Sequence, residues 1–321
     1  MNATDKLTSS VNNVSVTTLS TALFLTCMVP ILICTIAGNG LVVCAVYKYH
    51  HLRTPTYLII ASLAVADFFT GFIGIPLYMY FNFSKNTRCD SSSTISFATP
   101  FTVLSAVSFF QILTITTDRY IAITRPLHYV STVTIERVRI VIVFTWMACS
   151  AFFLTRSYLL VSKNANVITM KCPTGYFEDP LLWAVNLSVL AGSSLVFFML
   201  TGFNLRILRI AFKQSRMIYQ GNEDFGRNRG NHEISIKNLK GTQTICIIVF
   251  IFIVCFLPTQ ISFGIELSPL NDYSLSSVLA HVNIISLGIN SAVNPLIYGY
   301  RDRLFREAFN DLRRSLIALI L

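Results

Sequence analysis

Residues 56–80 read TYLIIASLAVADFFTGFIGIPLYMY and contain one carboxylate, Asp67, in an otherwise mostly apolar stretch. A helix needs about 20 such residues to cross the hydrocarbon core of a bilayer, so this stretch is long enough to span a membrane. Six further stretches of similar length lie near 22–47, 97–117, 140–161, 181–205, 241–265 and 274–298. The sequence therefore predicts an all-α membrane protein with seven membrane-spanning helices joined by polar linkers.

The composition agrees with a membrane protein. Of the 321 residues, 53% are hydrophobic and 12% are charged, whereas an ordinary soluble domain has roughly 45–50% and about 25%. The net charge of +10 comes from basic residues that are scattered between apolar segments. Nucleic-acid binding is not expected, because it requires basic residues gathered on one face.

The distribution of Lys and Arg predicts the orientation of the chain, since these residues stay preferentially on the cytoplasmic side. Nineteen of the 25 basic residues lie in 48–55, 118–139, 206–240 and 299–321, which places the N-terminus outside the cell. Glycosylation sequons at Asn2, Asn13 and Asn82 fall on that outer side. We predict an extracellular tail over 1–21, a seven-helix domain over 22–298 and a cytoplasmic segment over 299–321.

Two of the eight cysteines, Cys89 and Cys172, lie in outer loops. The outer side is an oxidising compartment and the two loops can meet, so we predict a disulfide between these residues.

The cytoplasmic segment contains the stretch RDRLFREAFNDLRRSL at residues 301–316. At helical spacing its apolar residues share one face and its basic residues the other. This pattern predicts a short amphipathic helix on the inner leaflet of the bilayer.

Asp67 lies near the middle of the second span, where an ionisable group costs several kcal/mol and usually has a function. Nearby spans offer hydroxyl and amide oxygens, which are the ligands that a small hard cation prefers. These oxygens belong to Ser108, Asn290, Ser291 and Asn294. A hydrogen-bonded polar cluster without an ion is the alternative, and the residues alone do not separate the two.

The third span carries a stripe that links the two membrane surfaces, because its members follow spacings of three and four residues. The stripe consists of Phe101, Ser105, Ser108, Ile112, Ile115 and Arg119. Asp118 and Tyr120 flank Arg119 at the inner end. Pro258 in the sixth span and Pro295 in the seventh each remove a backbone hydrogen bond, so both are candidate hinges.

These residues together resemble the rhodopsin-like G-protein-coupled receptors over all seven spans. The short motifs agree in order, spacing and depth. They are GNGLV around Asn39, LAVAD ending at Asp67, TTDRYIAI around Arg119, RPLHY around Leu127, Trp146, CFLP at 255–258 and NPLIY at 294–298.

The resemblance implies roles for these positions. Asp67, Ser108, Asn290, Ser291 and Asn294 would hold an allosteric sodium ion, and no other cofactor is expected. Phe256 would be the toggle beneath the ligand, and Leu127 would insert into the G protein. The coupling and switch residues would be Asp118, Arg119, Tyr120, Leu127, Asn294, Pro295 and Tyr298. A heterotrimeric G protein is the expected partner at the plasma membrane, together with an arrestin and a receptor kinase.

Several positions depart from the family pattern. Asn204 stands where a tyrosine that steadies the active state is usual, and Asn238 replaces the common acidic partner of the switch arginine. We therefore expect basal signalling.

Cys89 also departs from the family pattern, because it lies five residues earlier than the usual cysteine at the top of the third helix. Proline is favoured in the first turn of a helix. Pro100 thus predicts that the third helix begins near Thr99, which would give Cys89 slack to reach Cys172.

By the resemblance, the ligand pocket opens outward. Its expected residues are Phe101, Thr102, Ser105, Ser188, Phe256, Gln260, Phe263, His281, Ile284 and Gly288. Phe101 stands where amine receptors have an aspartate, so an amine ligand would lack its ion-pair partner. The stretch NPLIYGYRDRLFREAF is most similar to the adenosine receptors, and the missing fifth-span proline is similar to the melanocortin receptors. Phe263, Leu287 and Gly288 nevertheless replace the polar contacts of adenosine receptors, and the acidic cluster of melanocortin receptors is missing. The remaining pocket is aromatic and weakly polar, which favours a small amphipathic ligand or a short peptide.

A membrane channel or transporter is the main alternative. It predicts a continuous polar path and repeated halves, and neither is evident. An intramembrane enzyme would need a metal cluster or a nucleophile with a base, and the spans contain neither, so no enzymatic activity is expected.

Overall fold

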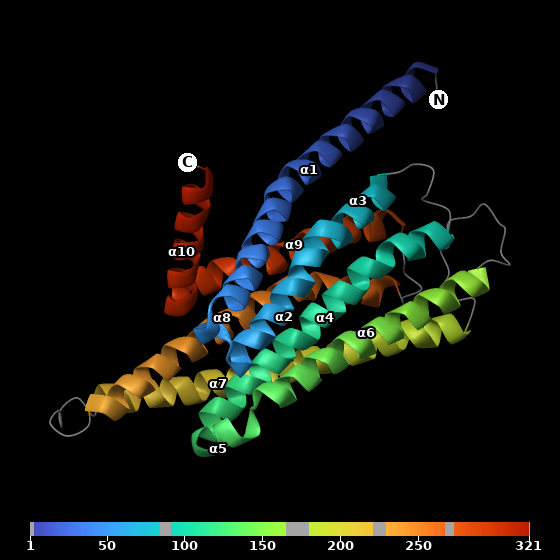
Figure 1. Ribbon diagram of the computed structural model, residues 1–321. Helices are drawn as coiled ribbons and strands as arrows, with labels where there is room; N and C mark the ends of the chain where they lie inside the picture. The colour runs from blue at the N-terminus through green and yellow to red at the C-terminus, as the bar shows by residue number, and fades with distance from the viewer. Residues whose placement is uncertain (1–2, 84–90, 165–179, 221–228, 267–272, 321) are drawn as a thin grey trace.

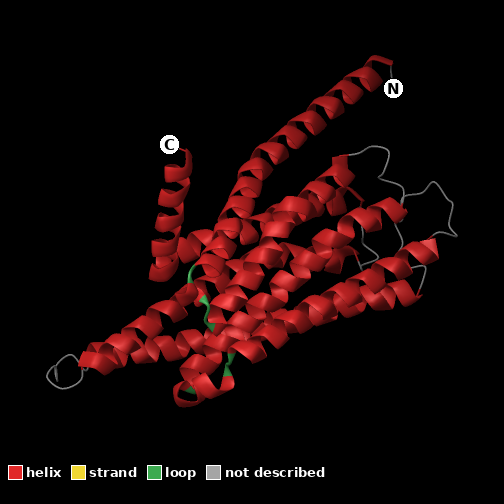
Figure 2. Ribbon diagram, viewed as in Figure 1, coloured by secondary structure: helices red, strands yellow, loops and turns green. Residues whose placement is uncertain are grey.

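The computed structural model describes residues 3–83, 91–164, 180–220, 229–266 and 273–320. All regular structure in these ranges is helical (Figure 2). The elements in chain order are α1 (Ala3–Lys48), η1 (His50–Leu52), α2 (Pro55–Phe69), η2 (Thr70–Gly74), α3 (Ile75–Phe83), α4 (Ser91–Thr124), α5 (Pro126–Thr132), α6 (Ile135–Asn164), α7 (Pro180–Gln220), α8 (Arg229–Glu266), α9 (Tyr273–Arg301) and α10 (Arg303–Ile320).

Six of the described stretches are long and apolar enough to cross a membrane. They are Phe24–Lys48, Pro55–Tyr80, Thr99–Thr124, Ile135–Leu159, Trp183–Ile210 and Cys246–Ile265. The second combines α2, the π-helical turn η2 and α3. The seventh crossing is α9, whose 29 residues include Asn283 and the buried Asn290 and Asn294. The predicted seven-helix bundle is confirmed.

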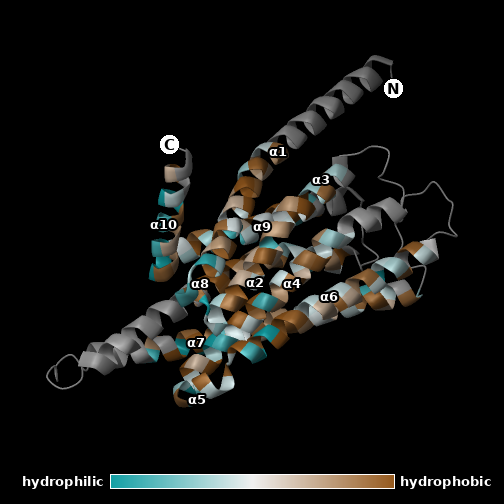
Figure 3. Ribbon diagram, viewed as in Figure 1, coloured by the Kyte–Doolittle hydropathy of each residue, from teal (hydrophilic) through white to brown (hydrophobic). Residues whose placement is uncertain are grey.

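The helix α4 lies at the centre of the bundle and packs against α2, α6, α7 and α8, while α9 packs between α1 and α8 (Figure 1). The described parts of α6 and α7 are rich in hydrophobic residues (Figure 3). Many of these are exposed to the surroundings, such as Phe144 and Phe198. Apolar outward faces of this kind are suited to lipid.

The helix α10 turns away from the bundle axis directly after α9 (Figure 1). Asp302 fixes this turn, because its Oδ1 accepts hydrogen bonds from the backbone N–H of Leu304 at 2.9 Å and of Phe305 at 3.3 Å. Tyr57 of α2 donates to its Oδ2 at 2.9 Å. The predicted apolar face turns inward, with Phe305 and Ala308 buried. The amphipathic helix is therefore confirmed.

The start of α4 is where the sequence prediction is wrong. The helix begins at Ser91, and Pro100 lies inside it instead of in its first turn. A proline inside a membrane helix is tolerated where neighbouring groups satisfy the freed carbonyl. The segment between Cys89 and the first residue of this helix is therefore shorter than a helix start near Thr99 would give.

Glycines bring α1 close to its neighbours. A Cβ at Gly38 would lie 2.9 Å from Cβ of Pro295, whereas a Cβ at Gly40 would lie at an ordinary 3.6 Å from Phe68. Only glycine therefore lets α1 meet α9 at the height of the NPLIY motif.

We predict that Gly38→Ala destabilises the protein, since overpacking costs about 1–3 kcal/mol. The melting temperature of the purified protein should fall by several degrees, while the control Gly40→Ala on the same helix should leave it nearly unchanged. Equal melting temperatures for the two variants would contradict this close packing.

Candidate functional site

The described residues form three connected features, and the first is a buried carboxylate. Asp67 of α2 is fully buried. Its Oδ1 accepts hydrogen bonds from Ser108 of α4 at 3.0 Å and Ser291 of α9 at 2.8 Å, and its Oδ2 accepts one from Asn294 at 2.9 Å. One buried carboxyl group therefore joins three helices in the middle of the bundle.

The polar cluster continues on both sides of Asp67. Asn39 of α1 donates to the backbone oxygen of Ser291 at 3.0 Å. Asn290 Oδ1 and the Tyr298 hydroxyl are buried and have no hydrogen-bond partner among the described residues. Hydrogen bonds thus join four of the five predicted sodium ligands, and the fifth, Asn290, offers an unused buried oxygen.

The second feature is the ion pair of Arg119 and Asp118 at the end of the bundle where α10 lies. Arg119 Nη2 lies 2.6 Å from Asp118 Oδ2. Thr56 donates to the same carboxylate oxygen at 2.9 Å, and Arg119 also contacts the Thr56 hydroxyl. Tyr129 of α5 donates to Asp118 Oδ1 at 2.7 Å. The Asp118 side chain is consequently surrounded by donors from three elements.

Burial and the adjacent Asp118 charge raise the pKa of the Tyr129 hydroxyl. The hydroxyl therefore stays protonated and keeps donating its hydrogen bond at neutral pH. Thr56 and Tyr129 had no role in the sequence prediction. Tyr129 stood inside the quoted RPLHY motif, but its contact with Asp118 depends on how α5 folds back.

The other predicted coupling residues take distinct positions at this end. Leu127 of α5 is 93% exposed. Tyr120 is half-buried, and its ring lies 5.2 Å from that of Phe203 on α7. Tyr298 is buried and stacks on Phe305 of α10 at 5.6 Å.

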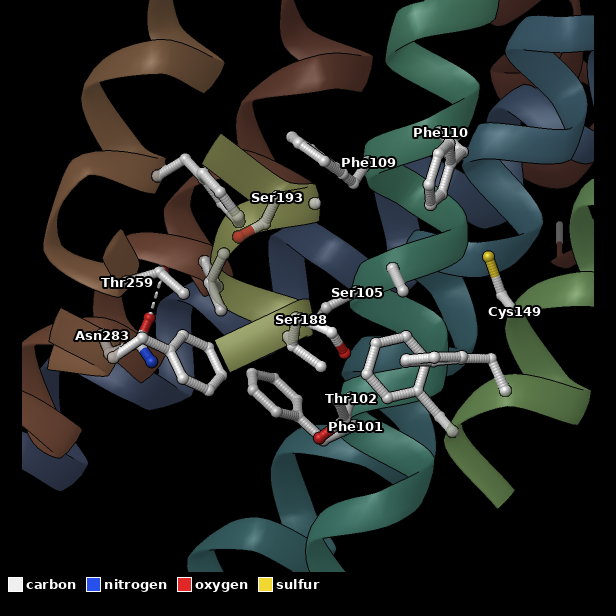
Figure 4. Close-up of a pocket in the computed structure, with 18 of the residues that line it drawn as sticks. Phe101, Thr102, Ser105, Phe109, Phe110, Cys149, Ser188, Ser193, Thr259 and Asn283 are labelled. Carbon is white, nitrogen blue, oxygen red and sulfur yellow. Dashed lines mark hydrogen bonds between the residues drawn. The ribbon is translucent and has the colours of Figure 1, made fainter. Parts of the chain in front are cut away.

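The third feature is a cavity of about 570 Å³ nearer the opposite end of the bundle (Figure 4). Six of the ten predicted ligand residues line it. They are Phe101, Thr102, Ser105, Ser188, Phe256 and Phe263.

The structure places the other four predicted ligand residues outside this lining. Gln260 hydrogen-bonds to Ser193 and Ser194 at 3.0 Å, and His281 meets Phe24 edge to face at 5.0 Å. Ile284 is buried in the hydrophobic core. Gly288 lies against Ile31, whose Cγ2 would be 2.9 Å from a Cβ at this position.

Sequence reasoning missed the part of the lining that comes from α6. Ala148, Cys149, Phe152 and Phe153 contribute to the cavity wall. The fourth span is apolar on most sides, so no periodic signal separates a cavity-facing residue from a lipid-facing one. Thr259 and Asn283 were also missed, and their side chains are joined by a 2.5 Å hydrogen bond.

A stack of phenyl rings joins the cavity to the middle of the bundle. Phe109 of α4 and Phe256 of α8 both line the cavity, and their ring centroids are 4.8 Å apart. Phe252, one turn along α8, stacks on both rings at 5.2 and 5.3 Å. Phe109 directly follows Ser108, which binds Asp67, so the stack and the carboxylate cluster share α4.

Some predicted sites cannot be placed. Cys89, Cys172 and Asn2 lie outside the described residues, and Asn13 and Asn82 lie in helical segments whose side chains are not described. The disulfide and the glycosylation sites remain predictions.

Comparison with known proteins agrees with this architecture. Adenosine receptor A2a of Cavia porcellus is 31% identical over 308 residues, covering 92% of this chain and 74% of the relative. Adenosine receptor A2a of Homo sapiens is 30% identical over 314 residues, covering 92% and 73%. Trace amine-associated receptor 2 of Mus musculus is 29% identical over 289 residues, covering 85% and 79%.

The likeness to adenosine receptors is confirmed, and the likeness to trace amine-associated receptors is a finding that the motifs did not indicate. Residues 38–298 match the family described as 7 transmembrane receptor (rhodopsin family). This match begins within the first crossing and covers the other six, and the family is one of receptors and not of enzymes. The chain belongs to the rhodopsin family of seven-transmembrane receptors, which signal through G proteins.

Proposed function

We propose that this receptor binds a small uncharged ligand in the cavity of Figure 4 and passes the signal to Arg119 at the far end of the bundle. The observation that carries the proposal is the stack of Phe109, Phe252 and Phe256. Two of its rings touch the cavity, and the third lies one helical turn nearer to Arg119. A ligand that displaces Phe256 must therefore move Phe252 as well.

The proline hinges support this route. Pro258 lies inside α8 two residues after Phe256, and Pro295 lies inside α9 next to Asn294, which binds Asp67. Each proline removes one helical hydrogen bond and allows bending at that point. We therefore expect α8 to bend next to the ring stack and α9 to bend next to the carboxylate cluster.

The lining favours an uncharged ligand. No Asp, Glu, Lys or Arg contributes to the described wall of the cavity, and burying an unpaired charge is costly. The names of the relatives point to adenosine and to trace amines. A protonated amine would find no carboxylate among the lining residues, so of these two classes the uncharged nucleoside agrees better with the absence of charge. A short peptide is the runner-up and would need to present an uncharged end.

The proposed partner surface lies at the α10 end, which the Lys and Arg distribution assigns to the cytoplasm of a plasma-membrane protein with an external N-terminus. Leu127 is exposed on α5, the helix whose Tyr129 contacts Asp118. A heterotrimeric G protein would cover Leu127 and replace Asp118 as the partner of Arg119. An arrestin and a receptor kinase would use the same end.

Asp67 and its neighbours fit a sodium ion. Among the described residues, Asn290 Oδ1 is a buried oxygen without a hydrogen-bond partner, and the hydroxyls of Ser108 and Ser291 each lie within hydrogen-bond distance of Asp67 Oδ1. These are hard oxygen donors with one net negative charge, as a small cation requires. Sodium here would favour the resting arrangement.

We predict basal G-protein activation that depends on Leu127. Membranes containing the receptor should stimulate nucleotide exchange above mock membranes for at least one of a panel of Gα subtypes. Burial of the Leu127 side chain against the G protein would contribute about 1.5–3 kcal/mol to binding. Leu127→Ala should therefore reduce coupling about tenfold. The control Val130→Ala, also exposed on α5, should have little effect. Exchange equal to mock for every subtype, despite surface expression, would overturn the proposal.

Sodium should raise the melting temperature of the purified receptor when it replaces N-methylglucamine. At ten times its Kd a bound ion stabilises by about 1.4 kcal/mol, which corresponds to about 2–4 °C. The shift should disappear in Asp67→Asn. It should persist in Ser62→Ala, a control on α2 whose buried hydroxyl bonds to Trp146. A sodium shift in Asp67→Asn would place the ion elsewhere.

Tyr129→Phe should raise basal nucleotide exchange, because it removes one hydrogen bond from buried Asp118 and frees the Arg119 pair. Hydrogen bonds to charged groups contribute about 1.5–3 kcal/mol, so an increase of about tenfold or more is expected. The exposed Tyr300 supplies the control Tyr300→Phe. Because the pKa of the Tyr129 hydroxyl is raised, the hydroxyl keeps its proton as the pH rises. Basal nucleotide exchange of the wild-type receptor should therefore stay constant from about pH 6.5 to 8.5. Unchanged exchange in Tyr129→Phe would count against this restraint.

A further inference from the structure

The cavity has a wall that faces the bilayer. Besides α4, α8 and α9, its lining includes Ala148, Cys149, Phe152 and Phe153 of α6 and Ser188, Val189 and Gly192 of α7. In Figure 4, Cys149 of α6 and Ser188 of α7 lie to either side of α4. The helices α6 and α7 touch little along their described lengths, so the wall between them is thin.

Side-chain exposure locates an opening in that wall. Phe110 of α4 is 38% exposed and Phe152 of α6 is 47% exposed, although both line the cavity. Gly192 of α7 is also exposed, and a Cβ built on it would meet no atom within 4 Å. Residues that touch both the cavity and the surroundings mark a gap, and the surroundings at this depth are lipid.

The end of this gap farther from α10 is closed. Arg156 lies one turn beyond Phe152 on α6, and its Nη2 donates to Asn186 Oδ1 on α7 at 2.6 Å. The hydroxyls of Thr99 and Ser157 join α4 to α6 at 2.5 Å in the same region. These contacts tie the three helices together on the side that faces water, whereas the gap beside Gly192 stays open.

The chemistry of the wall matches a molecule dissolved in the bilayer. Seven of the lining residues are phenylalanines. The hydroxyls of Ser188 and Ser193 already donate to backbone oxygens at 2.7 and 3.1 Å, and Thr259 donates to Asn283. Most of the remaining lining is apolar, so a hydroxyl-rich nucleoside would lose more hydrogen bonds to water than the wall could replace.

From these observations we infer that the receptor's ligand is an uncharged lipophile with one small polar end, and that it reaches the cavity sideways through the gap between α6 and α7. The cavity of about 570 Å³ lies within the usual range of ligand pockets. This inference rests on the proposed use of the cavity for ligand binding and adds the ligand's class and route.

The test uses the full-length receptor in phosphatidylcholine nanodiscs and a diazirine-bearing hexadecanol as the probe. After illumination, mass spectrometry locates the adducts. We expect adducts on the peptides that carry Ser105, Phe109 and Cys149, and an excess of plain hexadecanol should reduce them at least tenfold. Adducts on the lipid-facing residues Val29 and Ile33 of α1 should not be competed, and they serve as the internal reference.

A series at Gly192 tests the route. Gly192→Ala should leave labelling unchanged, since its Cβ meets nothing, whereas Gly192→Phe should reduce labelling of Ser105 and Phe109 about tenfold by filling the gap. Gly202→Phe is the matched control on the same helix, outside the lining and equally open. A normal melting temperature for each variant verifies folding.

Three results would overturn the inference. They are labelling that hexadecanol does not compete, labelling in Gly192→Phe equal to that of Gly202→Phe, and labelling that adenosine blocks while hexadecanol does not. Nucleotide exchange measured on the same wild-type samples separates the two proposals. If exchange is present but the labelling result is negative, only the lipophile and its route fail; if exchange is absent for every Gα subtype, the proposed function fails.

Discussion

A carboxylate enclosed by membrane helices has no water to solvate it, so the protein must provide every partner. Asp67 meets this requirement through Ser108, Ser291 and Asn294, which come from two other helices. Asn39 extends the cluster to α1 through the backbone of Ser291. No single helix could satisfy the charge, so the bundle closes around it. The tight contact of Gly38 with Pro295 follows from the same closure, since α1 and α9 meet at that height.

The helix α4 connects this cluster to both functional ends. Its inward stripe passes from Phe101 at the cavity through Ser108 at the carboxylate to the turn that holds Asp118 and Arg119. Between Phe101 and Thr124 α4 contains no proline at which it could bend, so we expect transmission to depend on the helices that pack against it. The two hinge prolines lie in α8 and α9. The ring stack and the carboxylate are the two places where they meet α4.

The seven spans, the amphipathic helix and the membership of the carboxylate cluster could be predicted from the sequence. Each rests on a local property: apolar length, helical spacing, or a polar residue at an improbable depth. Contacts that depend on tertiary packing could not be predicted in this way. Tyr129 reaches Asp118 only because α5 folds back, and Phe152 faces the cavity only because of the rotation of α6. Gly288 was expected in the pocket by the family resemblance, but its side-chain direction faces Ile31 of α1 instead.

The contacts around Asp67 and the contacts around the cavity are of different kinds. Around Asp67 the contacts are directional hydrogen bonds, which permit few arrangements and favour discrete states. Around the cavity they are mostly apolar contacts, which are non-directional and proportional to the area buried. A ligand in such a cavity is selected mainly by shape and by the exclusion of charge. Whether a bound ligand activates the receptor then depends on its position relative to Phe256. Displacement of the Phe256 ring is the movement that can change the hydrogen-bonded arrangement around Asp67.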